Sequence, residues 1–297
     1  MAEAAAPAVD EPHPSRPPDE TDLPAAAAEA PASTFAIYRA LARAQVRAQA
    51  SYRVSFALDL VSNVVFLGAD LLTVLVVFQQ VPVLAGFSLA EALLVFGLSS
   101  LAFSLADLAV GNIERMKHYV RTGLLDAVLI RPLGVLSQLV VLDIGLRRLG
   151  RVATGVAMLA FAANRAGVQA TPANLLLLVI APLAGAVFFG AVFVATATVA
   201  FWWVESGELS AALTYGGRDF TAYPMTIYGG WFRHLLAFGL GFGLVAYYPA
   251  LILLDRPDPI GGPWWLGWCG PVLALAAAGV ATLVWRTGVR HYRSTGS

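Results

Sequence analysis

Lysine is almost missing from this sequence, and the one that occurs, Lys117, follows Met116. A Walker A phosphate-binding loop needs a Gly-Lys-Ser/Thr sequence. These 297 residues therefore cannot bind and hydrolyse ATP through such a loop of their own. If ATP drives the protein, another chain has to carry the nucleotide site.

Cysteine and histidine are also scarce. The single cysteine, Cys269, excludes an internal disulfide, and the four histidines lie far apart in the sequence. Structural metal sites and Cys/His nucleophiles depend on ligands that occur in characteristic spacings. We therefore expect neither a metal site nor a catalytic centre of this kind.

Charge is low as well. Charged residues make up 13% of the chain and hydrophobic residues 58%, with a mean hydropathy of +0.71, whereas a soluble domain is about 25% charged. This composition is typical of a polytopic membrane protein. The net charge is zero, and nucleic-acid binding needs a basic patch, so no nucleic-acid partner is expected.

Six apolar segments are long enough to span a membrane, which takes about 20 mostly apolar residues. They cover residues 54–78, 89–110, 135–163, 174–204, 235–254 and 266–285. The third contains Arg147, Arg148 and Arg151, so we predict one long helix whose first half lies at the cytoplasmic surface. The alternative is a separate interfacial helix followed by a short span. The predicted fold is all-α, with six transmembrane helices.

The positions of Lys and Arg predict the orientation, because cytoplasmic loops carry the excess. With both termini in the cytoplasm, the outer loops hold only Arg165 and Arg256 of the 19 basic residues, which leaves 19 − 2 = 17 for the inner side. Arg148 and Arg151 would extend to the inner lipid headgroups. The bias of arginine over lysine and the high alanine content suggest a bacterial protein of the inner membrane.

Two further segments precede the spans. Residues 1–33 are rich in Ala, Pro and acidic residues and lack the apolar core of a signal peptide, which predicts a disordered cytoplasmic tail. Residues 34–53 carry Arg39, Arg43 and Arg47 at helical spacing. This basic helix either lies on the inner membrane surface or against a partner, or is simply a positive-inside anchor.

Between the second and third spans lies a long cytoplasmic stretch, residues 111–134, that mixes charged and apolar residues. A short amphipathic helix here could offer an apolar face to another protein. Gly123 is expected to end that helix, and Pro132 to start the next, since proline is tolerated in a first helical turn.

Two motifs carry a resemblance to a known family. The first is Gly123-Leu-Leu-Asp126 followed by Leu129-Ile-Arg131-Pro132-Leu133. The second is Tyr223-Pro224 followed by Tyr228, Arg233 and Tyr247-Tyr248-Pro249-Ala250. Residues 35–292 resemble the six-span bacterial branch of the ABC-2 family of transporter permeases. The resemblance rests on these two motifs, on the spacing between them and on the predicted topology.

The resemblance implies a permease subunit of an exporter. Two permeases, alike or paired with a sister permease, would sit in the lipid bilayer on two ABC ATPase subunits, which bind ATP and Mg²⁺, while this chain holds no cofactor. A coupling helix within residues 111–125 would enter a groove on the ATPase. Its expected contact residues are Arg115, Lys117, Tyr119 and Arg121, with Gly123 beside them. Asp126 is expected to pair with an arginine or cap a helix, fixing the angle to the third span.

Two carboxylates are predicted inside the first span, Asp59 and Asp70, eleven residues apart and so on nearly the same helix face. Charges within spans face bundle interiors or water and mark functional sites by default. Asp70 either lines a substrate path or subunit interface, or pairs with an arginine, serine or threonine of a neighbouring helix. The alternative function is an ion-gradient-driven secondary transporter, although such folds usually show repeated halves and this sequence shows no half-to-half repeat.

Overall fold

The computed structural model describes residues 53–142, 147–259 and 261–292. The predicted tail, residues 1–33, and the basic helix before Arg53 lie outside this part. Within it all regular secondary structure is helical, apart from one isolated bridge between Leu84 and Phe87. The predicted all-α fold class is therefore confirmed.

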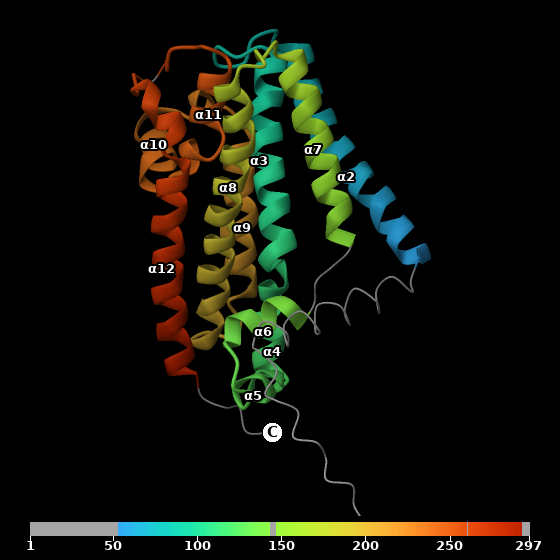
Figure 1. Ribbon diagram of the computed structural model, residues 1–297, viewed down its shortest axis with the longest axis vertical. Coiled ribbons are helices and arrows are strands. Elements are labelled where there is room, and N and C mark those ends of the chain that lie inside the picture. The colour runs from blue at the N-terminus through green and yellow to red at the C-terminus, as the bar shows by residue number, and fades with distance from the viewer. Residues whose placement is uncertain (1–52, 143–146, 260, 293–297) are drawn as a thin grey trace, which may run out of the picture.

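Six helices of sixteen residues or more form an upright bundle (Figure 1). They are α2 (Arg53–Gln80), α3 (Leu89–Val110), α7 (Arg147–Arg165), α8 (Pro172–Thr198), α9 (Gly207–Ala222) and α12 (Gly270–His291). Helix α8 packs between α3 and α12, α7 packs on α3, and α2 packs on α7 at the edge. We call the end at which α3 and α8 finish the lower end, and the opposite one the upper end.

Short helices close both ends of the bundle. At the lower end lie η2 (Gly111–Arg115), α4 (Met116–Arg121), α5 (Leu124–Leu129), α6 (Val135–Leu142) and η3 (Val199–Phe201). The segment between α9 and α12 contains η4 (Met225–Ile227), α10 (Gly230–His234), η5 (Leu235–Gly239), η6 (Phe242–Leu244), α11 (Tyr247–Leu253) and η7 (Trp264–Trp268).

Small residues let the long helices approach closely. A Cβ atom on Gly185 of α8 would lie only 2.7 Å from the Cβ of Ala102 on α3, and one on Gly97 of α3 would lie 3.1 Å from the Cα of Leu159 on α7. In lipid there is no hydrophobic driving force between helices, so helices associate through the close packing that small residues such as glycine and alanine allow.

Four helical stretches of the described chain are long and apolar enough to cross a membrane: Val61–Gln80, Leu89–Arg121, Pro172–Phe201 and Gly270–His291. A fifth is reached if the bent pair Gly230–Gly239 and Phe242–Leu253 is one span. The chain is thus a multi-pass membrane protein by length and composition.

The third predicted segment is described as two helices, one on each side of residues 143–146. Helix α6 lies across the lower end, whereas α7 runs along the bundle (Figure 1). Leu139 of α6 is buried in the core at that end, and Arg148 and Arg151 of α7 pair with α3. Both predicted alternatives place the first part of this segment across the lower end and the second part along the bundle, and what distinguishes them, residues 143–146, lies outside the described residues.

The fifth predicted segment, residues 235–254, is not one straight helix either. Its two halves are bent by 63°, and Gly241 at the bend has φ +78°, a conformation that favours glycine. Most of α11 is buried against α3 and α8, with Tyr247 and Ala250 fully enclosed. The expectation of an unbroken fifth helix was wrong.

Helix α9 lies where the sequence predicted a cytoplasmic loop. Its lower part is fixed by Ser210, whose hydroxyl donates to the carbonyl of Thr196 near the end of α8. Its upper part reaches the middle of α3, where Thr221 and Ser99 share a hydrogen bond. Pro224 then stops the helix, because a residue before proline prefers extended backbone, as Tyr223 has.

Candidate functional site

The lower lobe, residues 111–142, comprises η2, α4, α5 and α6 and has an apolar core of its own. Ile113, Met116, Leu125 and Leu139 are essentially inaccessible. The same cluster includes Trp285 of α12 and alanine and valine side chains of α8. The lobe is therefore packed onto the bundle, so its movement would carry the lower ends of these helices along.

Two buried amides hold the backbone of the lower lobe together. The Nδ2 of Asn112 donates to the carbonyl of Leu139 at 2.8 Å, and to the hydroxyl of Tyr119 at 3.2 Å. The Nε2 of Gln138 donates to the carbonyls of Val128 and Leu133 at 3.1 and 3.0 Å. Each amide joins helices that are separate in sequence, and together they fix the shape of the lobe.

The recognised motif of this region forms the turns of the lobe. Gly123 separates α4 from α5 with φ +69°, as its predicted role as a helix terminator requires. Asp126 lies in the first turn of α5, and burial together with this carboxylate raises the pKa of Tyr292, after α12, to about 12. The prediction that Pro132 starts the next helix was wrong, because α6 begins only at Val135.

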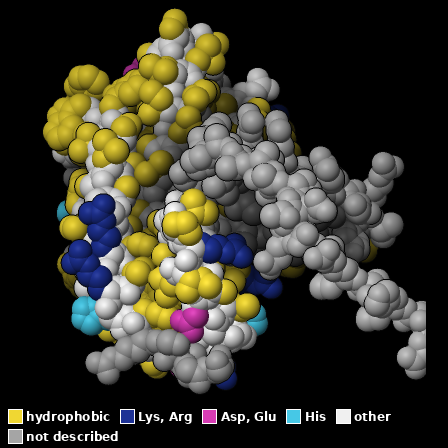
Figure 2. All heavy atoms as spheres, turned by 60° about the horizontal axis from the view of Figure 1, so that its bottom comes forward, with side chains coloured by type: hydrophobic (Ala, Val, Ile, Leu, Met, Phe, Trp, Pro, Cys, Tyr) yellow, Lys and Arg dark blue, Asp and Glu magenta, His cyan; other side chains and the backbone are white. Residues whose placement is uncertain are grey.

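The tip of the lower lobe exposes apolar and basic side chains. Ile130 is 84% exposed and Leu124 48%, and Arg121 and Arg131 are exposed beside them in sequence. Figure 2 shows this end of the molecule, where Lys and Arg side chains stand among hydrophobic ones. Large exposed apolar residues next to charged ones mark protein interaction sites.

The predicted contact residues of this segment have different environments. Arg115 and Arg121 are exposed. Lys117 is half-buried and donates to Glu205, in the connection between η3 and α9, and Arg121 lies 3.5 Å from the same carboxylate. Tyr119 is half-buried and accepts from Asn112. Lys117 and Tyr119 thus make contacts within the chain, and Glu205 was not expected as the partner of Lys117.

The Glu205 pair is expected to make the attachment of the lobe sensitive to pH. The hydrogen bond from Lys117 lowers the pKa of Glu205 below its ordinary value of 4.5. Stabilisation from a lowered carboxyl pKa is present above the ordinary value and is lost as the pH falls through the lowered one. The protection of amide hydrogens in residues 111–142, corrected for the intrinsic pH dependence of exchange, should therefore fall below about pH 4.5 in the native chain. Glu205→Gln should exchange faster at neutral pH and lose this pH dependence; equal pH profiles would contradict the expectation.

A second polar cluster joins α3 to α7. Asp107 is buried and pairs with Arg151 at 2.6 Å and with Arg148 at 3.4 Å. Gly111 lies against Asp107 and Arg148 so closely that any side chain there would overlap the carboxylate. Asp107 pairs with both guanidinium groups within the bundle, but the side chain of Arg151 is still 44% exposed, so the extension to lipid headgroups stays a prediction.

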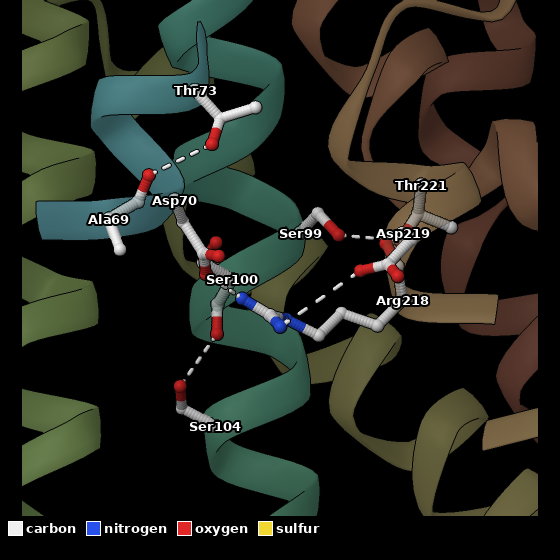
Figure 3. A network of polar contacts seen from close by, with 9 residues as sticks. All are labelled: Ala69, Asp70, Thr73, Ser99, Ser100, Ser104, Arg218, Asp219 and Thr221. Atoms are coloured by element: carbon white, nitrogen blue, oxygen red, sulfur yellow. Dashed lines mark hydrogen bonds and ion pairs between the residues drawn. The ribbon is translucent and has the colours of Figure 1, made fainter. Parts of the chain in front are cut away.

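Next to this cluster, Asp70 of α2 pairs with Arg218 of α9 (Figure 3). Arg218 also lies 4.0 Å from Asp219 and over the ring of Phe103, with its Cζ 5.7 Å from the ring centroid. The pairing of Asp70 with an arginine is the second of the two predicted alternatives. Asp59 lies in α2 too, but its side chain is outside what the structure describes.

A polar cavity of about 210 Å³ opens between α2, α3, α7 and α9. Its walls include Asp70, so this residue also borders the cavity, and the first alternative, a substrate path or subunit interface, stays a prediction. The lining residues are Asn63, Phe66, Asp70, Ser100, Phe103, Ser104, Arg151, Thr154, Gly155, Tyr215 and Arg218. Arg151 was not predicted to lie with Tyr215 and Arg218, because no local spacing relates it to these two residues of α9.

A polar link connects the cavity to the lower lobe. The hydroxyl of Tyr215, in the cavity wall, donates to the carboxylate of Glu114 in η2 at 3.2 Å. Arg151, also in the wall, is bound to Asp107, one turn before η2 on α3. Two separate contacts therefore join the cavity to the beginning of the lobe.

The second recognised motif lies apart from this cavity. Pro224 follows α9 and is buried, while Tyr248 and Pro249 are buried in α11. Tyr247 beside them donates its hydroxyl to Asp258 at 2.9 Å. These residues shape the bent segment above α9, and none of them reaches the cavity wall.

Comparison with known proteins gives one match. The sequence model of a family described as ABC-2 family transporter protein matches residues 64–296, which is most of the chain. No curated protein and no solved structure matches the sequence. The match includes the lower lobe, the cavity and the bent segment.

Proposed function

The chain belongs to the ABC-2 family of transporter proteins, and on this premise we propose that it is the permease subunit of an ATP-driven exporter. ATP and Mg²⁺ bind to a separate ABC ATPase subunit, because the only lysine, Lys117, is not in a Gly-Lys-Ser/Thr sequence. The permease works as a pair, either of two copies or with a sister permease, in the inner membrane of a bacterium.

The lower lobe is the observation that carries this proposal. It is fixed to the bundle by a buried core and two amides, yet exposes Leu124, Ile130 and Arg121 at its tip. An exposed apolar side chain on a short helix suits a groove on a partner protein. The tip therefore docks on the ATPase, and the attached core transmits the movement of the ATPase to α3, α8 and α12.

The proposed topology has six crossings with both termini in the cytoplasm. In chain order, the first four crossings are α2, α3, α7 and α8. The fifth is made by α9 together with the bent segment above it, and the sixth is α12. In this arrangement the lower end is cytoplasmic, and Arg233 joins Arg165 and Arg256 on the outer side. The cytoplasmic loops still carry the excess of basic residues.

Transport proceeds by alternating access between two arrangements of the permease pair. When the ATPases close on ATP, they displace the lower lobes. Helix α9 moves with the lobe because two contacts join them. One is between Glu114 and Tyr215, and the other is between Lys117 and Glu205, which precedes α9 in the chain. The substrate path then opens to the other side of the membrane, and no covalent chemistry takes place in this chain.

The test is co-expression with a candidate ABC ATPase, purification through a tag on this chain and an ATPase assay in lipid nanodiscs. We expect a stable complex whose ATP hydrolysis changes on assembly. Scrambling residues 111–125 should abolish the association. If no ATPase is retained, even with a candidate sister permease present, the coupling proposal fails and the ion-gradient-driven transporter becomes the function to test.

A further inference from the structure

The polar cavity has an unusual set of charges for a space within a helical bundle. Its wall contains two guanidinium groups, those of Arg151 and Arg218, and one carboxylate, that of Asp70. Arg151 is already bound to Asp107 behind the wall. The ion pair between Arg218 and Asp70 is therefore the polar contact that can be exchanged for a ligand.

The two partners of this ion pair are held to different degrees. Arg218 belongs to α9, which packs on α3 and α8, and its guanidinium rests on the ring of Phe103 and near Asp219. Asp70 belongs to α2, the edge helix, which packs mainly on α7 and exposes most of its surface. If the pair opens, Asp70 leaves with α2 while Arg218 stays in the wall.

An arginine inside a membrane that loses its close ion-pair partner is costly, because its charge is poorly hydrated there, and the remaining carboxylate, that of Asp219, is 4.0 Å away. The guanidinium group forms paired hydrogen bonds with carboxylate and phosphate oxygens, and these are the strongest partners available to it. When α2 moves away and the ion pair opens, binding of another anionic group to Arg218 is therefore favourable. The hydroxyl of Ser100 in the wall can donate to the same anion.

The size of the cavity limits what enters it. Pockets for drug-sized ligands measure about 300–1,000 Å³, and this cavity of about 210 Å³ is smaller. It can hold a headgroup but not a long apolar chain. Phe66 forms part of the wall and is also 72% exposed on α2, beside exposed Val65. An apolar chain can therefore leave the cavity along this face of α2.

We propose that the cavity binds the anionic headgroup of an amphiphile, a phosphate or carboxylate, which replaces Asp70 on Arg218 while the apolar chain lies beside Phe66. This assignment deepens the proposed exporter function by naming a substrate class. The binding itself is a property of the permease alone, so it can be tested without the ATPase.

The experiment uses the full chain in nanodiscs of phosphatidylcholine and a dodecyl phosphate probe with a photoactivatable group in its alkyl chain. Illumination followed by peptide mapping should place the label on α2 around Phe66 or on α3 around Phe103. Unlabelled dodecyl phosphate should compete, whereas inorganic phosphate and dodecyltrimethylammonium should not. Competition by inorganic phosphate would assign the site to a free anion and overturn the amphiphile, and equal competition by the cation would overturn the anionic site.

Two variants test the exchange of partners. Arg218→Gln should reduce the labelling about tenfold, the value of a charge-assisted hydrogen bond, and Arg218→Lys should restore part of it. Asp70→Asn removes the competing carboxylate and should increase labelling about two- to fivefold. Because Asp70→Asn predicts a gain, a folding defect cannot imitate the result. If the labelling of the Asp70→Asn variant is lower than that of the native chain or equal to it, the proposal is overturned. This holds even if the ATPase complex forms as expected.

Discussion

Asp107→Ala is expected to lower the free energy of unfolding by about 3–5 kcal/mol, the cost of removing one partner of a buried ion pair. The carboxylate is buried and holds two guanidinium groups, those of Arg148 and Arg151. Its loss leaves both charges inside the bundle without an anion. The contact between α3 and α7 should weaken, and with it the support for the edge helix α2, which packs on α7.

Thermal unfolding in detergent measures this effect. At roughly 2–4 °C per kcal/mol for a chain of a few hundred residues, the melting temperature should fall by roughly 6–20 °C. Asp219→Ala is the matched control, because the side chain of Asp219 is 72% exposed and makes a single weak ion pair, with a guanidinium group 4.0 Å away. This variant should shift the melting temperature by less than about 2 °C. Similar shifts for both variants would show that Asp107 is no anchor of the bundle.

Ile130→Asp is expected to weaken binding of the ATPase about 10- to 100-fold. Burial of an isoleucine side chain contributes about 1.5–3 kcal/mol, and every 1.4 kcal/mol is a factor of ten in affinity. Ile130 is 84% exposed in the isolated chain, so its replacement costs the lobe little stability. The loss should therefore appear in binding to the partner and leave the melting temperature of the permease unchanged.

Ile130→Leu is the control for this experiment, because it keeps the apolar surface and the volume. Binding is measured by titrating the ATPase onto the permease in nanodiscs, with both variants and the native chain side by side. If the aspartate variant binds as tightly as the leucine variant, the tip of the lower lobe is not the docking surface. In that case the ATPase contact has to lie on another part of the lower end.

Hydropathy predicted several long helices closely. The second span was predicted for residues 89–110 and is observed as Leu89–Val110. The fourth and sixth were predicted within a few residues of α8 and α12. These predictions succeeded because a long apolar segment can satisfy its backbone hydrogen-bonding groups in lipid only as a helix. Local composition is therefore sufficient to determine these helices.

The same rule failed for residues 235–254. These residues are as apolar as a span, yet the structure bends them at Gly241 and buries them against α3 and α8. Burial within a protein and exposure to lipid demand the same apolar composition, so hydropathy does not distinguish them. The Tyr223-Pro224 break and the glycines that follow could have indicated a bent segment.

The candidate site was predicted only in part. Gly123 was expected to end a short helix and lies two residues after the end of α4, and the residues of the resemblance located the lower lobe, but the short helix α5 directly after Gly123 was not predicted. The partners of the charged residues were not foreseen, because Asp70 and Arg218 are 148 positions apart and Asp107 and Arg151 are 44 apart. No local pattern encodes such pairs.

The sequence by itself determined that this protein is helical and embedded in a membrane, and that it has no Walker A loop. Apolar length and the surroundings of Lys117 suffice for these conclusions, because they depend on one segment at a time. Only the tertiary structure decided which carboxylate meets which arginine, where a cavity opens, and which apolar helix turns back. Those features depend on packing between distant segments, where a contact forms only after several helices have taken their places.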